Sequence, residues 1–310
     1  MKRIIFFFCL LFLLIHGHVS VFAQVPVVST GTIIRVDSFH SSYVTARNID
    51  IWLPPGYSEN EKYDVLYMHD GQMLFDSTIN WNHSEWQVDE TASRLISSNK
   101  IRPCIVVGIW NSGLLRHSDY CPQKPIQGFT PAEKDSFYNS TRVTANRVFS
   151  DTVYSDKYLL FLTEELKPYI DNHFSVYTDP AHTMIAGSSM GGLISLYAIC
   201  EYPNVFGAAA CLSTHWPGVF ATLNNPFPEA MMHYLETHVP DPETHRIYFD
   251  HGTATLDSLY GAYQPLADRI FTKSGYTKNN RLSLVFPGEN HSEKAWAARL
   301  EYPLIFLLGK

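Results

Sequence analysis

The sequence predicts an α/β fold: one mostly parallel sheet that begins with an antiparallel pair of strands and carries helices on both faces. Two half-polar strand patterns come first in the chain, and short apolar runs then alternate with helical patterns up to the C-terminus. Alternation of this length is typical of a parallel sheet that is covered on both sides. Hydrophobic residues make up 45% of the 310 positions, which is enough for a core of that size.

Residues 1–23 have the pattern of a secretory signal peptide. Two basic residues precede an apolar run from Ile4 to Ile15, and small residues follow up to Ala23. Because the run is short for a membrane-spanning helix, we expect cleavage after Ala23 and a secreted or periplasmic protein without stable membrane insertion. Residues 24–310 contain no linker rich in Pro, Gly or Ser and are expected to form a single domain.

The first half of the mature chain predicts four strands and one helix. Alternating polar and apolar residues favour an antiparallel strand pair, and short apolar runs closed by turns favour buried strands. The expected elements are strands at 31–38, 44–55, 63–71 and 102–110 and a helix at 88–98. Residues 112–152 fit no element, contain three prolines and are expected to form a long loop over the edge of the sheet. Loops of that length in compact domains are often functional.

The second half repeats a strand–helix alternation. Apolar residues at helical spacing separate the apolar runs that predict strands. The expected helices are at 156–174, 191–202, 260–275 and 293–308, and the expected strands at 182–187, 205–213, 245–252 and 281–288. Helical connections between strands imply that these strands run parallel.

Charge and cysteine content exclude several classes of partner. The formal net charge is −7 at pH 7 and no run of Lys or Arg occurs, which argues against a nucleic acid or an anionic membrane as partner. Four cysteines remain after signal removal: Cys104, Cys121, Cys200 and Cys211. Three of them lie in apolar segments and none forms a Cys-x-x-Cys pair, so we predict neither a structural disulfide nor a metal site.

The strongest motif is the Gly-x-Ser-x-Gly pentapeptide at 187–191, whose central residue is Ser189. A predicted strand precedes it and a predicted helix follows it, which is the context of a nucleophile elbow. Both flanking positions are glycine because the turn is too sharp for larger side chains. The serine then stands at the start of a helix, where free N–H groups and the helix dipole favour negative charge. We predict that Ser189 is a nucleophile.

His291 is the predicted base for this serine. A serine hydroxyl needs a base that a third group orients, and in chains with such an elbow the acid and the histidine follow the serine. His291 comes directly after the last predicted strand, at the same edge of the sheet as Ser189. His215 also follows a strand at that edge and is placed to line the pocket.

Two aspartates are candidates for the acid. Asp250 ends a predicted strand, and Asp257 lies in the loop beyond it, from which it can reach the far nitrogen of His291. Asp257 is the preferred acid and Asp250 the alternative. The oxyanion hole is expected to use the backbone N–H groups of Met190, directly after the nucleophile, and of Gln72, in the loop after the third strand.

Seven segments together carry a family resemblance. They are WLPPGY, VLYMHDGQMLFD, IVVGIWNS, ELKPYID, IAGSSMGGLISLY, FDHGTATLDSLY and ENHSEKAWAARL, in this order. This set resembles the esterase-D-like branch of the α/β-hydrolase superfamily, which also holds feruloyl, acetylxylan and enterochelin esterases and the mycolyltransferases. The resemblance implies a serine hydrolase that needs no cofactor, with Ser189, Asp257 and His291 as its triad. In many relatives the acid follows the Gly-Thr pair more closely than Asp257 does, and some enterochelin esterases are thought to use a Ser–His dyad.

Aromatic and polar side chains near the strand ends suggest the substrate. Trp110, Asn111, Arg116 and Trp216 are the predicted substrate-binding residues. Aromatic platforms suit sugar rings or a feruloyl group, and an arginine can hold a carboxylate. Trp81 and Trp86 are further aromatic candidates.

With predicted export, these residues favour a small-molecule or glycan ester as substrate, most of all an acetyl or feruloyl ester on a carbohydrate. Three alternatives stay open: hydrolysis of a siderophore trilactone of the enterochelin type, acyl transfer to an acceptor other than water, and a non-catalytic binding protein on the same fold. The oligomeric state is not indicated by the sequence.

Overall fold

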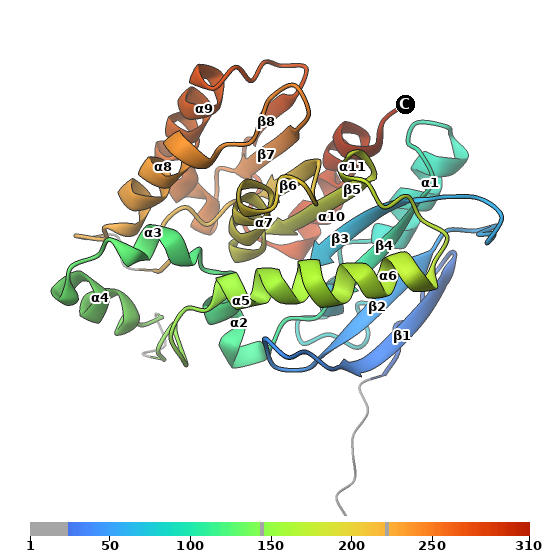
Figure 1. Ribbon diagram of the computed structural model, residues 1–310, viewed down its shortest axis with the longest axis horizontal. Coiled ribbons are helices and arrows are strands. Elements are labelled where there is room, and N and C mark those ends of the chain that lie inside the picture. The colour runs from blue at the N-terminus through green and yellow to red at the C-terminus, as the bar shows by residue number, and fades with distance from the viewer. Residues whose placement is uncertain (1–23, 143–145, 221–222) are drawn as a thin grey trace, which may run out of the picture.

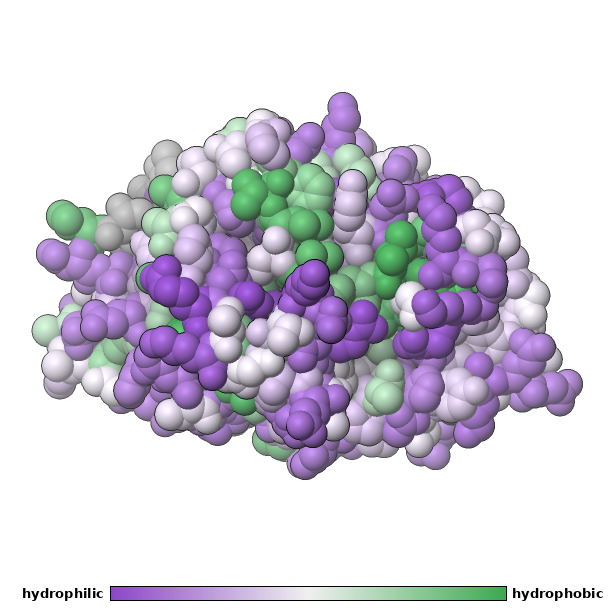
Figure 2. Space-filling model, turned by 90° about the horizontal axis from the view of Figure 1, so that it is seen from above, coloured by the Kyte–Doolittle hydropathy of each residue, from purple (hydrophilic) through white to green (hydrophobic). Residues whose placement is uncertain are grey.

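The computed structural model describes residues 24–142, 146–220 and 223–310. The predicted signal peptide, residues 1–23, lies outside this part of the chain. None of the helices in the described part combines the length and the apolar character that crossing a bilayer requires. On the face of the molecule shown in Figure 2, hydrophilic residues cover much of the surface and hydrophobic residues form smaller patches among them.

In the described residues, the sheet has eight strands in the order β1-β2-β4-β3-β5-β6-β7-β8 (Figure 1). The strands are β1 (Thr32–Phe39), β2 (Arg47–Leu53), β3 (Asp64–His69), β4 (Cys104–Ile109), β5 (Thr183–Ser188), β6 (Ala208–Leu212), β7 (Arg246–Gly252) and β8 (Arg281–Phe286). β2 runs antiparallel to both β1 and β4, and all other neighbours are parallel. The predicted fold class, including its antiparallel N-terminal pair, is therefore confirmed.

Helices cover both faces of the sheet. They are α1 (Val88–Ser97), α2 (Arg116–Tyr120), α3 (Gln123–Gln127), α4 (Pro131–Tyr138), α5 (Ser155–Leu160), α6 (Lys167–His173), α7 (Met190–Glu201), α8 (Phe227–His238), α9 (Gln264–Lys273), α10 (Glu293–Arg299) and α11 (Glu301–Leu308). A π-helical segment (Phe161–Leu166) joins α5 to α6, so the predicted helix at 156–174 is one continuous helical stretch. Short 3₁₀ helices lie at Gly71–Met73 (η1) and Thr255–Ala262 (η5).

Buried side chains of the strands alternate between two hydrophobic cores, one on each face of the sheet. In β3, Val65 and Tyr67 belong to the core beneath α5, α7, α8 and α9, whereas Leu66 and Met68 belong to the core beneath α1, α10 and α11. This is the two-residue period of a strand that is buried on both sides. It explains why β3, β4 and β5 read in the sequence as continuous apolar runs.

The prediction that residues 112–152 contain no element is wrong. This stretch forms α2, α3 and α4; α2 packs on α5 and α7, and α3 packs on α8. The first two helices have five residues each, too few to show helical periodicity in the sequence. A start signal was present for α4, because Thr130 and Glu133 form a capping box with Pro131 at the first helical position.

The carboxyl ends of the parallel strands form one edge of the sheet, and the loops that leave this edge hold the predicted site residues. Ser189 follows β5, Asp257 follows β7, and His291 follows β8. Gln72 lies in η1 after β3, and Asn111 follows β4. In open α/β sheets, ligands bind at this edge.

Candidate active site

Ser189 occupies a strained turn between β5 and α7. Its backbone has φ 58° and ψ −122°, a conformation that residues with a side chain rarely adopt. A Cβ on Gly187 would lie 2.7 Å from the carbonyl carbon of Gly191, and a Cβ on Gly191 would lie 3.3 Å from Cβ of His69. The backbone contact thus requires glycine at 187, whereas a side chain at 191 would need His69 and Asp70 to shift by a few tenths of an ångström. The geometry matches the nucleophile elbow that the motif predicts.

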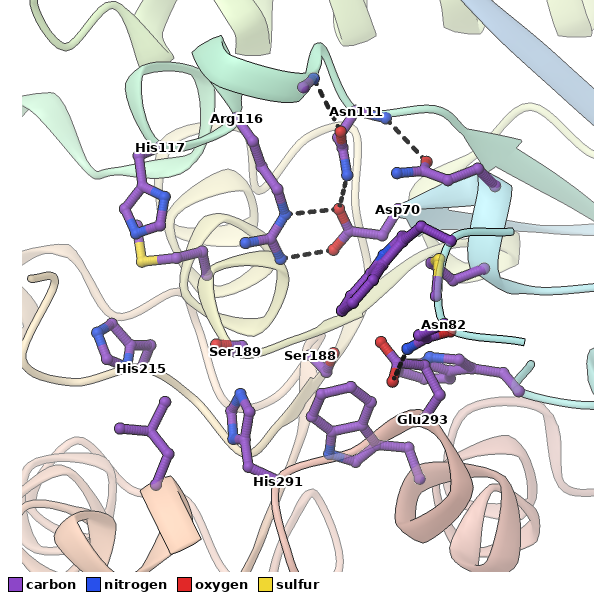
Figure 3. A pocket seen from close by; sticks show the side chains of 18 of the residues that line it. Asp70, Asn82, Asn111, Arg116, His117, Ser188, Ser189, His215, His291 and Glu293 are labelled. Atoms are coloured by element: carbon purple, nitrogen blue, oxygen red, sulfur yellow. Dashed lines mark hydrogen bonds and ion pairs between the residues drawn. The ribbon is translucent and has the colours of Figure 1, made fainter. Parts of the chain in front are cut away.

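The serine opens into a cavity of about 660 Å³ at the sheet edge (Figure 3). The walls come from segments after six different strands, β3 to β8. Lining residues with polar or charged side chains are Asp70, Gln72, Asn82, Asn111, Arg116, His117, Arg142, Ser188, Ser189, His215, His291 and Glu293. Aromatic side chains in the wall are Trp81, Trp86, Phe220 and Trp296. The volume lies in the ordinary range for a small-ligand site.

His291 is held by Asp257. Nδ1 of His291 donates to Oδ1 of Asp257 over 2.5 Å, and the backbone N–H of His291 donates to Oγ1 of Thr255 over 2.9 Å. The imidazole packs edge-on against Trp296, with ring centroids 4.9 Å apart. With Nδ1 engaged, Nε2 is the nitrogen left for a reacting group, and Figure 3 shows the ring turned toward Ser189.

Asp257 is completely buried and accepts three hydrogen bonds. Besides His291 at Oδ1, the hydroxyl of Ser213 donates to Oδ2 over 2.7 Å and the N–H of Gly252 donates over 2.6 Å. Burial alone would raise the pKa of Asp257, but the hydrogen bonds from His291 and Ser213 outweigh it and lower the pKa below the ordinary value of 3.8. The carboxylate is thus ionised at neutral pH.

Asp250, the alternative acid, has other partners. Its carboxylate accepts from Nη2 of Arg299 over 3.0 Å and from the hydroxyl of Tyr248 over 2.9 Å. Among the described residues, no hydrogen bond joins Asp250 to a histidine side chain. The geometry therefore favours Asp257 over Asp250 as the partner of His291.

Both predicted oxyanion donors border the cavity that contains Ser189. Met190 is the first residue of α7 and Gln72 is the second residue of η1, and N–H groups at such positions lack an acceptor within their own helix. Gly71 permits this arrangement, because a Cβ there would lie 2.5 Å from the carbonyl carbon of Gly108.

A polar network that the sequence did not predict surrounds Asp70. Nε and Nη2 of Arg116 donate to the two carboxylate oxygens of Asp70, each over 2.7 Å, and Nδ2 of Asn111 donates to Oδ1 over 2.7 Å (Figure 3). Although burial raises the pKa of Asp70, Arg116 and Asn111 lower it below its ordinary value. Arg116 and Asn111 line the cavity as predicted. Asp70 occupies the Nε–Nη2 edge of the guanidinium, so only the remaining N–H donors of Arg116 are left for a substrate carboxylate.

The other two predicted substrate contacts are wrong in their placement, because neither Trp110 nor Trp216 lines the cavity. Trp216 is fully buried and donates its indole N–H to Gln264 over 3.2 Å. The indole N–H of Trp110 donates to Asp50 over 2.6 Å, and its ring lies under the guanidinium of Arg35. From the sequence, a tryptophan next to a strand end can be placed near the edge of the sheet, but the direction of its ring cannot be predicted.

Three further polar residues belong to the wall: His215, which the sequence placed there, and His117 and Glu293, which sequence reasoning did not find. His117 is buried beside Arg142, and burial holds its pKa well below the ordinary value, so it is neutral. Burial likewise lowers the pKa of His215 to about 3, and its Nδ1 lies 2.8 Å from the hydroxyl of Tyr260. Glu293 begins α10 and accepts from Nδ2 of Asn82 over 2.8 Å. His117 and Glu293 carry no sequence signal, whereas Asp70 directly follows a buried strand and could have been noticed.

Residues 41–307 match the model of a family described as "Putative esterase". This is well over half of the chain. The chain belongs to this esterase family. The membership agrees with the resemblance found in the sequence motifs.

Individual relatives of the chain are distant. It is 27% identical over 172 residues to the uncharacterized protein YbbA of Bacillus subtilis, covering 55% of this chain and 58% of YbbA. It is 26% identical over 197 residues to an endo-1,4-beta-xylanase/feruloyl esterase of Xylanibacter ruminicola, covering 60% of this chain and 22% of that protein. The chain thus spans less than two thirds of the length of the curated relatives it matches. A ferulic acid esterase structure from Anaeromyces mucronatus has a TM-score of 0.57 at 18% identity, covering 90% of this chain and 91% of that one, which shows the shared fold.

Proposed function

We propose that this esterase is an exported serine esterase that hydrolyses a carboxylic ester through an acyl-enzyme, with Ser189, His291 and Asp257 as its triad. One observation carries the proposal. The 2.5 Å contact between Nδ1 of His291 and Asp257 fixes the imidazole beside a serine that stands on a strained elbow in the same cavity. These are the relations of nucleophile, base and orienting acid that acyl transfer requires.

In the first half of the reaction, Oγ of Ser189 attacks the ester carbonyl while Nε2 of His291 takes the hydroxyl proton. The carbonyl π electrons move to its oxygen, which the N–H groups of Met190 and Gln72 stabilise as an oxyanion. The tetrahedral intermediate collapses, the bond to the alcohol oxygen breaks, and Nε2 returns the proton to that oxygen. Asp257 remains ionised throughout and stabilises the imidazolium.

In the second half, water replaces the serine as nucleophile. Nε2 of His291 removes a proton from the water, whose oxygen attacks the acyl carbon, and the second oxyanion forms at the same donors. When this intermediate collapses, the proton goes to Oγ of Ser189 and the acid product leaves. No other reactant is consumed, so free serine and imidazole are regenerated.

For the substrate, we propose an acetyl or feruloyl ester on a carbohydrate. The cavity wall combines Trp86, Trp296 and Phe220 with polar groups, and Trp81, with 81% of its surface exposed, stands at the rim. An exposed indole offers a stacking face to a sugar ring, and the aromatic wall suits a feruloyl ring. The name of the Xylanibacter ruminicola relative supports this substrate class. We also propose that residues 1–23 direct export, which would bring the enzyme to extracellular or periplasmic glycans.

The test is release of p-nitrophenol from p-nitrophenyl acetate by residues 24–310. We expect turnover by the wild type and a loss of several orders of magnitude for Ser189→Ala. Ser188→Ala is the matched control, because it changes the neighbouring serine and should keep activity within about tenfold of wild type. Equal activity of Ser189→Ala and wild type would contradict the assigned nucleophile. If both are inert, hydrolysis of small acyl esters is excluded.

The substrate class is then tested with acetylated xylan, feruloylated arabinoxylan and a siderophore trilactone. We expect acid release from the glycans at a higher kcat/KM than from the trilactone. The opposite order would replace the carbohydrate proposal with the lactone. Transfer of the acyl group to an added sugar in preference to water would identify an acyltransferase.

A further inference from the structure

Ser213 is a hydrogen-bond partner of Asp257, the proposed triad acid. It follows β6, is completely buried, and has φ 42°, a left-handed backbone that residues other than glycine rarely adopt. Its N–H donates to the carbonyl oxygen of Asp250 over 2.7 Å, which ties this turn to β7. Such strain persists only where the surroundings impose it, and here it places Oγ among three polar partners.

The direction of each hydrogen bond at Ser213 follows from chemistry. Nε1 of Trp296 lies 3.0 Å and Nη2 of Arg299 lies 2.9 Å from Oγ, and both groups can only donate. A hydroxyl has one proton and two lone pairs, so both lone pairs of Ser213 are used. Its proton must therefore go to Oδ2 of Asp257, 2.7 Å away.

The same arginine joins two buried carboxylates. Nη2 of Arg299 donates to Asp250 over 3.0 Å and lies 3.8 Å from Oδ2 of Asp257, and all three side chains are at most 2% exposed. Two carboxylates and one guanidinium leave a net negative charge in the interior. When His291 takes the proton of the nucleophile, its positive charge joins that of Arg299. The charges of these two cations and of the two carboxylates then sum to zero. A fixed arrangement of this kind favours the imidazolium without reorganisation.

We propose that Ser213 and Arg299 are positioning residues for catalysis: they align the Asp257 carboxylate and set how strongly it supports the proton on His291. This inference rests on the proposed function, because it concerns the same triad. Trp296 belongs to the arrangement, since its ring contacts His291 while its N–H is anchored on Ser213.

Ser213→Ala tests the proposal through activity and its pH dependence. We expect kcat/KM to fall on the order of tenfold, the effect of one hydrogen bond to a charged group. The acid limb of the profile of kcat/KM against pH should move to higher pH. Without the hydroxyl of Ser213, the Asp257 carboxylate accepts one hydrogen bond fewer and therefore stabilises the imidazolium of His291 more strongly. The other charged or titratable groups packed around the Asp257–His291 pair are Asp250 on β7, Tyr260 on η5, Glu293 and Arg299 on α10, and His215 after β6. Ser155→Ala, at another fully buried serine that does not line the cavity, should change neither quantity.

A double-mutant cycle separates positioning from mere packing. If Ser213 acts through Asp257, then Ser213→Ala has no further effect on kcat/KM once Asp257→Asn is in place. An equal loss in both backgrounds would overturn the proposal. Arg299→Lys keeps the positive charge but not the planar guanidinium, whereas Arg299→Met loses both. The acid limb of the pH profile should therefore lie closer to that of the wild type in Arg299→Lys than in Arg299→Met.

A second readout does not depend on turnover. The protonation of His291 is followed by NMR as a function of pH in Ser189→Ala and in the double variant Ser189→Ala/Ser213→Ala. The signal of His291 is identified as the one that disappears in His291→Gln. We expect the midpoint to be higher in the double variant. An unchanged midpoint would overturn the role of Ser213 even if the esterase proposal holds. A shifted midpoint in a protein without esterase activity would contradict the proposed function alone.

Discussion

At the residue scale, Asp257 and Asp250 are both buried carboxylates, and their partners decide what each one does. We expect Asp257→Asn to lower kcat by roughly three to four orders of magnitude with little change in KM, because an amide no longer holds His291 in the reactive tautomer. Asp250→Asn removes the ionic partner of Arg299 and should instead destabilise the fold by about 3 kcal/mol. Both kcat and urea unfolding are measured for each variant. A loss of kcat in Asp250→Asn as large as that in Asp257→Asn, at unchanged stability, would reverse the two roles.

The sequence predicted the site residues whose position follows from a motif. It missed those whose role depends on a contact with a residue far away in the chain. Ser189 and His291 lie next to strand ends that the apolar pattern identifies, and the reach of the loop beyond Asp250 then favoured Asp257 as the acid. Asp70 and Arg116 meet across 46 positions of sequence, and neither has a local signal for that pairing. The rings of Trp110 and Trp216 turn away from the cavity because Asp50 and Gln264 accept their indole N–H groups.

At the element scale, the β5–α7 turn depends on glycines that permit close backbone contact. Gly187→Ala brings a methyl group to 2.7 Å from the backbone of Gly191, so we expect a loss of about 1–3 kcal/mol in urea unfolding together with lower activity. Gly128→Ala is the matched control. A Cβ at Gly128 meets no atom within 4 Å and its φ is −74°, so the change should be neutral or stabilise by up to about 1 kcal/mol. Equal stability of the two variants would show that the turn can relax.

The sequence predicted the strands and helices that are long enough to show a hydrophobic pattern, and it missed the shorter helices. The strands buried on both faces read as apolar runs, and the 156–174 helix shows several turns of helical spacing. By contrast, α2 and α3 are single turns held by packing on α5, α7 and α8, a tertiary cause that local sequence does not contain. The expected 293–308 helix is divided into α10 and α11 at Leu300. Pro303, in the first turn of α11, is the sequence signal for this break, because a proline has no N–H to donate to the carbonyl four residues earlier.

At the scale of the whole molecule, the segment before β1 anchors the N-terminal side of the sheet to α1. The N–H and hydroxyl of Ser29 both donate to Oδ2 of the buried Asp89, over 2.8 and 2.9 Å, and the carbonyl of Thr30 accepts from the indole of Trp52 over 2.8 Å. Burial raises the pKa of Asp89 to about 6, so its ionised form depends on these donors. The described chain up to residue 30 is thus part of the folded domain, although no strand or helix begins before Thr32 in the described residues.

We therefore expect residues 31–310 to be less stable than residues 24–310 by at least about 2 kcal/mol at pH 8, because the Asp89 carboxylate stays buried without its donors. The sign follows from the raised pKa: below about pH 6 the carboxyl is protonated in the folded protein and needs fewer donors, so the difference between the two chains should shrink at pH 5. Thermal and urea unfolding of both chains at the two pH values measure this. Asp89→Asn, which removes the charge, should narrow the difference at pH 8. A difference that is independent of pH and of this substitution would assign the anchoring to Trp52 and to packing, and not to the carboxylate.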